Sequence, residues 1–379
     1  MNLHEFLTRT EIHLPMRWDA HRDFEAFVGE QLDTFLRLID QLDPNAVSDE
    51  VQRRKPSILS CCDGLRRSLR TFFEGHPREA YQHFAAAVQD ILLEINGLAF
   101  TVTGPTDFGI LYRVRQIQIP ALNRNDLFHI PFELRHVVAT QRYSIPGLPC
   151  LYLAGSLYTC WEEMGRPPLH ELQCAAFWVK PGRSLRMLNL SNRPARLAAV
   201  HAMPPGSVPS DHSFLSSHIV LWPLFFATSI FVKHRSSPFK PEYIFSQMVL
   251  QWLTQNHGVD GIAYFSTHVR AISKHHPLPI CNVIVPAKNI TAFGRCQWLC
   301  DTFKMTDPFG WQLLACINVG EGPGKGSIPM YDLEFIEGVE EPYRKTEFGT
   351  VQMKLNKMVS RITHRNRNGE PMLGDVAST

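Results

Sequence analysis

Residues 103–115 read TGPTDFGILYRVR, and this stretch decides how the chain is divided. Before it, apolar residues recur at helical spacing. Within it, residues 110–115 (ILYRVR) alternate as they do in a β-strand. Gly104 and Pro105 break the helical pattern. The change from one pattern to the other predicts a domain boundary near residue 100.

The residues before this break follow a helical pattern from about residue 18 to residue 96. A second amphipathic run spans residues 81–95, after the stop signal Gly75-His76-Pro77. The apolar positions with helical spacing in the first run are Phe24, Phe27, Leu32, Phe35, Leu36 and Ile39. We therefore predict an all-α domain over residues 1–100.

Short strand-like runs and two helical patterns are mixed after the break. The strand-like runs are residues 148–153, 174–179, 262–265 and 281–285, and the helical patterns are residues 157–164 and 242–256. This order predicts an α+β domain over residues 101–330. Charged and polar residues predominate after that, and the end, NRNGEPMLGDVAST, has the composition of a frayed tail. Residues 331–379 are thus predicted to be a polar C-terminal extension.

The composition is that of an ordinary soluble protein: 379 residues, 44% hydrophobic and 20% charged. A formal charge of +2 gives no field that would attract nucleic acid or a membrane, and we expect neither as a partner. Nine cysteines and a start without a leader pattern predict a reducing cytoplasm. The apolar run 219–232 contains Pro223 and is shorter than the roughly 20 residues of a spanning helix, which favours a buried core segment.

Five short motifs follow one another in the second domain. They are Tyr112-Arg113, residues 141–147 (QRYSIPG), residues 150–153 (CLYL), residues 159–163 (TCWEE) and residues 260–266 (DGIAYFS). In order and spacing, over roughly residues 104–290, they resemble the motifs of the RES family of bacterial NAD-degrading toxins. The resemblance implies an ADP-ribosyltransferase-like fold and an activity that breaks the bond between the nicotinamide and the ribose of NAD+.

The resemblance also implies roles for five residues. Arg113 and Arg142 would bind the diphosphate, because a guanidinium offers forked donors to phosphate oxygens. Tyr152 would position the nicotinamide end of NAD+. Glu163 would stabilise the positive charge that develops on the ribose, and Ser266 would complete the contacts with the ribose or a phosphate. The catalytic candidates are thus Arg113, Glu163 and Ser266.

Glu162 and Glu163 are adjacent on a predicted helix, so their side chains point about 100° apart and one of them can serve the site. The family spacing from Tyr152 favours Glu163. Structural interpretations stay open for the other candidates. An arginine on an alternating strand is commonly solvated, and Tyr152 faces either a cleft or solvent, away from both of its leucine neighbours. A serine after a strand is ordinary turn chemistry.

The N-terminal domain resembles the helical HEPN-like domains that precede some RES domains. HEPN ribonucleases use an arginine and a histidine at the spacing of Arg70 and His76, so RNA cleavage is one alternative function. We expect no metal cofactor, because Cys61-Cys62, the pair Cys296 and Cys300, and His275-His276 lack complementary ligands at zinc-site spacing.

The sequence therefore predicts a cytoplasmic enzyme whose substrate is NAD+, as a glycohydrolase or a phosphorylase. The resemblance implies a toxin restrained by an antitoxin or another regulatory protein, or an effector against phage. A homo-oligomer is also compatible with the sequence. Water, phosphate and a macromolecule remain open as the acceptor of ADP-ribose. The alternatives are an inactive protein that binds a regulatory partner and a HEPN-type ribonuclease.

Overall fold

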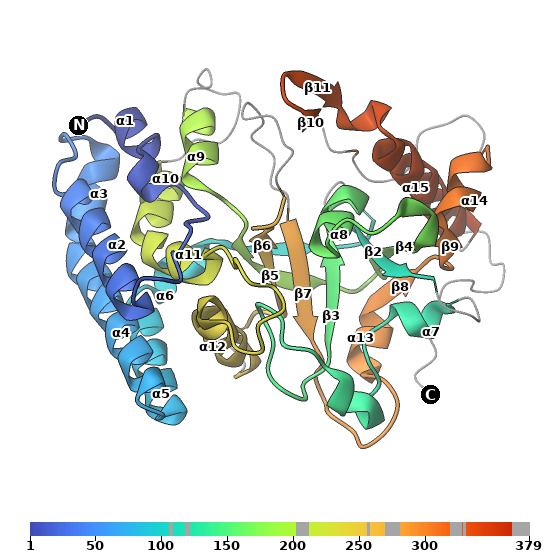
Figure 1. Cartoon of the computed structure of the whole chain (residues 1–379), viewed down its shortest axis with the longest axis horizontal. Helices are drawn as coiled ribbons and strands as arrows, with labels where there is room; N and C mark the ends of the chain where they lie inside the picture. Colours follow the sequence, from blue (N-terminus) through green and yellow to red (C-terminus); the bar gives the residue numbers. More distant parts are fainter. Residues whose placement is uncertain are drawn as a thin grey trace. The chain divides into compact units, whose positions relative to one another are not determined.

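The computed structural model describes residues 1–105, 109–117, 122–201, 212–255, 258–269, 281–318, 328 and 331–365 (Figure 1). The predicted frayed tail, residues 366–379, lies outside these ranges, as does the pair His275-His276. The chain divides into two compact units. Unit 1 comprises residues 1–99, 140–145 and 188–257, and unit 2 comprises residues 100–139, 146–187 and 258–379.

Unit 1 is helical, which confirms the helical pattern predicted from residue 18 to residue 96. Asp23 caps α2 by accepting a hydrogen bond from the backbone N–H of Ala26, and Pro77 starts α5 just after Gly75, which has φ of 91°. The elements are α1 (Leu3–Leu7), η1 (Thr10–Ile12), α2 (Phe24–Ile39), α3 (Ala46–Arg53), α4 (Lys55–Phe73), α5 (Pro77–Gln89), α6 (Leu92–Gly97), α9 (Pro194–His201), α10 (His212–Val220), α11 (Trp222–Ser229), η4 (Pro241–Tyr243) and α12 (Ile244–Thr254).

The apolar run 219–232 lies in the core of unit 1, as its length predicts. Trp222 of α11 stacks on Phe35 of α2, with ring centroids 4.4 Å apart, and Phe226 packs near Phe27. No helix in the described residues is long and apolar enough to cross a membrane. This packing explains why residues 188–257 group with the N-terminal helices, whereas the sequence assigned them to the second domain.

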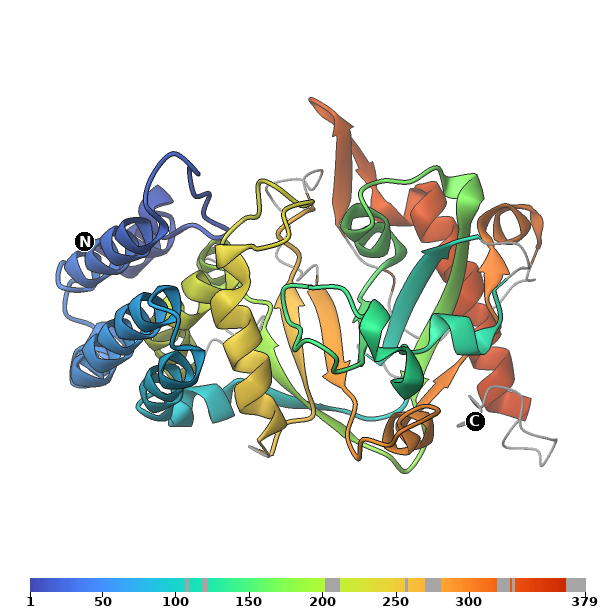
Figure 2. The ribbon, with the colours of Figure 1, turned by 60° about the horizontal axis from the view of Figure 1, so that its bottom comes forward.

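Strands β1 to β9 form one sheet. Its order is β1-β5-β6-β7-β3-β2-β4-β8, and β9 also pairs with β4. Most of it belongs to unit 2 (Figure 2). The predicted strand-like runs are confirmed. The strands are β1 (Ala99–Val102), β2 (Ile110–Gln116), β3 (Cys150–Ala154), β4 (Leu172–Val179), β5 (Leu185–Leu190), β6 (Gly261–Phe265), β7 (Cys281–Pro286), β8 (Phe303–Met305) and β9 (Phe309–Gly310).

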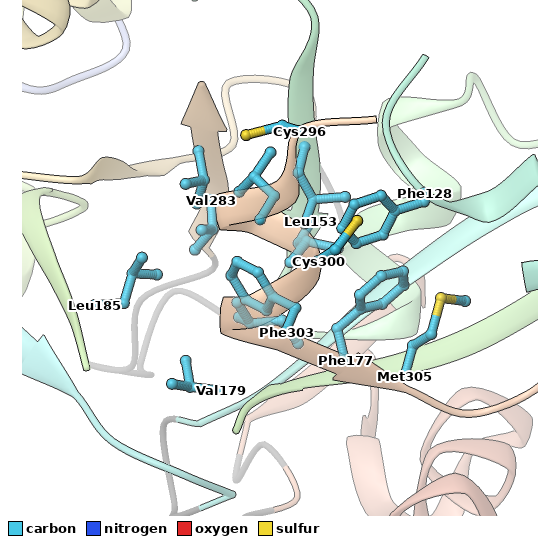
Figure 3. Packing of buried hydrophobic residues seen from close by; sticks show 14 of the residues in the cluster. Phe128, Leu153, Phe177, Val179, Leu185, Val283, Cys296, Cys300, Phe303 and Met305 are labelled. Atoms are coloured by element: carbon cyan, nitrogen blue, oxygen red, sulfur yellow. The ribbon is translucent and has the colours of Figure 1, made fainter. Parts of the chain in front are cut away.

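Short helices of unit 2 cover one face of this sheet. Leu153 and Phe177 of the sheet pack with Phe128, Cys300 and Phe303 (Figure 3). The covering elements are α7 (Arg124–Leu127), η2 (Phe132–Val137) and α13 (Gln297–Thr302). Apolar residues alternate along β2 and β4 so that the opposite face is buried as well.

The opposite face is covered by α8 (Leu157–Glu163), α14 (Trp311–Cys316) and α15 (Glu347–Arg365). Val351, Leu355 and Val359 of α15 are buried against it. The hairpin of β10 (Asp332–Ile336) and β11 (Val339–Pro342) precedes α15, and the short helices η3 (Leu169–Glu171) and η5 (Tyr343–Lys345) complete the unit. Residues 331–365 therefore supply core, although their polar composition predicted an extension. The apolar stripe of α15 has helical spacing, and overall polarity hides it.

The sheet is split between β2 and β3. Strand β2 pairs with β4 from Ile110 to Gln116, along its full length, but its register with β3 is limited to Tyr112 opposite Ala154. The two strands diverge from that point. Arg113 lies on β2 and Tyr152 on β3, the two strands that flank the split.

Candidate functional site

Glu163 is the last residue of α8, and its half-buried carboxylate accepts two hydrogen bonds on the same oxygen. Ser266 Oγ lies 2.6 Å from Oε1, and Asn282 Nδ2 lies 2.7 Å from Oε1. Within the described ranges no side chain donates to Oε2, and no lysine or arginine forms an ion pair with Glu163. One oxygen is thus held in place, while the other is available to a ligand.

Ser266 follows β6 and closes a turn there. Its Oγ accepts hydrogen bonds from the backbone N–H groups of His268 and Val269, at 3.2 and 3.3 Å. Because the oxygen accepts from both, the hydroxyl proton is directed to Glu163. The resemblance assigned Ser266 a contact with the ribose or a phosphate, and that role stays a prediction. Its contact within the protein is with the carboxylate.

Asn282 is a site residue that the sequence analysis missed, because residues 281–285 were interpreted simply as a strand. It lies on β7, in register with Ala154 of β3 and Tyr264 of β6, and it is 5% exposed. Asparagine is disfavoured inside strands. That mismatch was the one available signal, and it does not identify the partner of the amide.

Glu162 lies in a different environment from its neighbour. Its carboxylate accepts a hydrogen bond from Tyr158 Oη at 2.5 Å and pairs with Arg166, whose Nη2 lies 2.8 Å from Oε1. With 3% of Glu162 exposed, this charge is buried and already compensated. Adjacent carboxylates therefore differ in kind: Glu162 is bound to a cation and Glu163 to two neutral donors. The catalytic assignment of Glu163 stays a prediction, and the geometry is compatible with it.

No acidic side chain among the described residues offsets the charge of Arg113. Its Nη1 donates to the backbone carbonyl of Phe128 at 3.1 Å, and no carboxylate of the described residues lies within ion-pair distance of it. Burial lowers the pKa of Arg113 to about 9, and the charge of Arg115 adds to the effect. An anion bound beside the guanidinium would relieve this unfavourable burial.

Tyr152 lies near Arg113 at the split in the sheet. Burial raises the pKa of the Tyr152 phenol well above its ordinary value, with smaller contributions from Cys150 and Tyr264, and the charge of Arg113 opposes the rise. The phenol is therefore neutral at any working pH. It can donate a hydrogen bond and offer a flat face to an aromatic ring.

Cys160 lies one turn before Glu163 on α8. Its Sγ donates to the backbone carbonyl of Tyr112 at 3.4 Å, and burial raises the pKa of this thiol to about 12. A thiol with that pKa is not a nucleophile at neutral pH. The charge of Arg113 lowers the pKa of Cys160 and that of Glu163 raises it, so both charges act on the same thiol.

Arg142 belongs to unit 1, whereas the four other candidates belong to unit 2. Its Nη1 donates to the carbonyl of Thr228 at 3.0 Å and its Nη2 to the carbonyl of Ile230 at 2.8 Å. The guanidinium also lies over the ring of Tyr243, 5.2 Å from its centroid. These contacts orient Arg142 within unit 1, and its contact with a diphosphate stays a prediction.

The alternative site in the helical unit involves Arg70 and His76. Arg70 Nε donates to Glu25 Oε1 at 2.8 Å, and His76 precedes the first turn of α5. Neither observation tests RNA cleavage. Across the described part of the chain, no group of three or more histidine, cysteine, aspartate or glutamate side chains could hold a metal ion. All nine cysteines are free.

Comparison with known proteins shows a similarity to a bacterial protein. A protein of Bacillus subtilis (strain 168) named "Putative toxin YopC" is 27% identical over 347 residues, which cover 89% of this chain and 77% of that protein. No protein-family model matches the chain. No solved structure matches it either.

Proposed function

We propose that the chain degrades NAD+ by breaking the bond between nicotinamide and ribose, and that it acts as a toxin. The observation that carries this proposal is the Glu163 carboxylate, whose Oε1 accepts from Ser266 and Asn282. The resemblance of the five motifs to RES proteins supplies the reaction. The similar Bacillus subtilis protein, whose name is "Putative toxin YopC", supports the biological role.

The reaction suits a fixed carboxylate. When the bond between nicotinamide and ribose breaks, its electron pair leaves with the nicotinamide nitrogen, which becomes neutral. Positive charge then develops at the ribose, and Oε2 of Glu163 would stabilise it across a short distance. Oxygen from water or from phosphate then bonds to the same carbon and releases its proton to solvent. The first acceptor makes a glycohydrolase and the second a phosphorylase.

The groups around Glu163 fit the rest of the substrate. Arg113 would bind the diphosphate of NAD+, which would supply the negative charge that the guanidinium otherwise lacks. Arg142 is the second candidate for that contact. Tyr152, as a neutral phenol, would position the nicotinamide ring by stacking or by donating a hydrogen bond. The proposed reaction requires no proton transfer to or from Tyr152 or Cys160.

The same proposal places the enzyme in the cytoplasm, where NAD+ depletion would stop growth. A partner protein that covers the site, as an antitoxin does, would restrain it, and an effector against phage would be released by infection. The free cysteines are compatible with a reducing compartment. The proposal also includes self-association of the chain.

The direct test is NAD+ consumption by the purified full chain, with the products separated, in phosphate buffer and in phosphate-free buffer. Release of nicotinamide together with ADP-ribose supports a glycohydrolase. An added phosphorylated product that forms in phosphate buffer alone supports a phosphorylase. Folded protein that consumes no NAD+ in either buffer would contradict the proposal.

Two variants separate this activity from RNA cleavage. Glu163→Gln should strongly reduce NAD+ consumption, whereas His76→Ala should leave it unchanged because the proposal assigns His76 no contact with NAD+. RNA cleavage that requires His76 and ignores Glu163 would favour the ribonuclease instead. Absence of both activities from the folded wild type would favour a protein that binds a partner.

A further inference from the structure

We infer that Asn282 is a positioning residue, which fixes Glu163 so that Oε2 faces the reacting ribose. The inference rests on the proposed function and goes beyond it by adding a residue that neither the resemblance nor the similar toxin assigns. Its basis is the sharing of one carboxylate oxygen by two donors. Asn282 Nδ2 and Ser266 Oγ lie 2.7 and 2.6 Å from the same atom, Oε1.

Two donors on one oxygen determine the orientation of a carboxylate. A single donor would leave the group free to rotate about its terminal bond, and either oxygen could then face the substrate. Here the donors come from adjacent strands, because Ser266 follows β6 and Asn282 lies on the paired strand β7. The two donors therefore hold Oε1 as a unit, and any substrate group must meet Oε2.

The position of Asn282 is itself fixed by the sheet. The residue is 5% exposed, and its cross-strand neighbours are Ala154 on β3 and Tyr264 on β6. Ala154 has a small side chain, which leaves room for the amide to reach α8. A buried amide without a partner is unfavourable, because it loses its hydrogen bonds to water. The contact with Glu163 is what offsets this cost.

The neutrality of the two donors matters for the chemistry. Glu162, one residue earlier, is bound by the Arg166 guanidinium, which cancels its charge. An amide and a hydroxyl orient Glu163 without cancelling its charge, so the full negative charge is available to a cation at Oε2. Neither neighbour on α8 competes with Glu163 for a cation. Glu162 is paired with Arg166, and the Cys160 thiol is protonated.

The first test measures kcat and KM for NAD+ in Asn282→Ala and Asn282→Asp. For Asn282→Ala we expect kcat to fall about tenfold or more, with KM within about twofold, because the lost contact acts mainly in the transition state. In Asn282→Asp the introduced carboxylate repels Glu163 at neutral pH. At lower pH its protonated form can donate to Oε1, so activity should recover as the pH falls. Asn282→Ala should show no such recovery.

Asn356→Asp is the matched control. Asn356 is a buried asparagine of the same unit, 1% exposed, and it accepts a hydrogen bond from Tyr112 rather than contacting Glu163. It should retain the wild-type kcat and pH profile. Wild-type kcat in Asn282→Ala, or the same pH profile in both aspartate variants, would overturn the inference.

A second measurement works without turnover. A protonated iminoribitol carries positive charge where the ribose develops it, and calorimetry can measure its binding to each variant. We expect Asn282→Ala to weaken it about tenfold and Asn356→Asp to leave it unchanged. Should the wild type consume no NAD+, the proposed function fails, and this binding still decides the role of Asn282. Binding that is equal with and without the amide, or absent from the wild type, would overturn the inference.

Discussion

Ser266 donates a hydrogen bond of 2.6 Å from Oγ to Oε1 of Glu163, across 103 positions of sequence. The donor follows β6 and the acceptor ends α8, so the contact depends on where the sheet and the helix meet. Because two backbone N–H groups already donate to Oγ, the direction of the hydroxyl proton is set before any substrate binds. Ser266 therefore orients the carboxylate.

Ser266→Ala should lower kcat for NAD+ about tenfold or more while KM changes little, since a hydrogen bond to a charged group is lost where charge develops. Ser266→Thr keeps the hydroxyl and should restore most of the rate. Steady-state kinetics of both variants provides the check. Equal rates for the alanine and threonine variants would mean that the hydroxyl is not used.

Arg113→Met should weaken binding of ADP-ribose about tenfold or more, because an uncompensated guanidinium is removed from the site. The same change should keep or raise the melting temperature, since burial of this charge is unfavourable in the free protein. Calorimetry and thermal unfolding measure the two effects.

Arg124→Met is the matched control for Arg113, because Arg124 already pairs with Asp307 at 2.7 Å. It should bind ADP-ribose as the wild type does. If both variants bind equally well, Arg113 is not a diphosphate ligand.

The fold should lose stability in acid through His129, which is fully buried. Burial lowers the pKa of His129 to about 4, and Arg295 and Arg113 add to this effect. The unfolded chain, with a histidine pKa of about 6.5, binds more protons between these two values, so stability falls as the pH falls from 6.5 toward 4. His129 should account for a loss of about 2 kcal/mol between pH 7 and pH 5.

Urea unfolding of the wild type and of His129→Gln at both pH values measures that loss. The glutamine side chain can still accept from the backbone N–H of Cys296, as His129 Nε2 does at 2.9 Å. The variant should show a smaller difference between pH 7 and pH 5. An equal difference would mean that His129 is not responsible.

Removal of residues 1–99 should give an aggregated fragment. The deletion removes Phe35 and Phe27, which pack on Trp222 and Phe226 of α11. The apolar side chains of α11 would then be exposed to solvent. Size-exclusion chromatography of the fragment is the measurement. A folded, monodisperse fragment would show that α11 does not depend on α2.

Local patterns predicted much of the secondary structure. The strands β2, β3, β4, β6 and β7 and the helix α8 were visible because alternation and helical spacing are local properties. The choice of Glu163 over Glu162 came from the resemblance. Its structural counterpart is the ion pair of Glu162 with Arg166, which lies three residues beyond the end of α8. Their i,i+4 spacing was visible in the sequence.

Long-range properties could not be predicted in this way. Asn282 meets Glu163 through the register of β7 with β3 and β6, and no local pattern encodes a register between distant strands. The grouping of residues 188–257 with the N-terminal helices depends on aromatic packing between segments far apart in sequence. Composition also hid the apolar stripe of α15, because polar residues outnumber it.

The most direct test compares NAD+ consumption by the wild type, Glu163→Gln and Glu162→Gln. These variants make the same chemical change at adjacent positions. Glu163→Gln should reduce kcat by about a hundredfold or more, because the charge opposite the ribosyl cation is lost. Glu162→Gln should keep most of the wild-type kcat and lower the melting temperature, because Arg166 loses its partner. Wild-type consumption by folded Glu163→Gln would contradict the account.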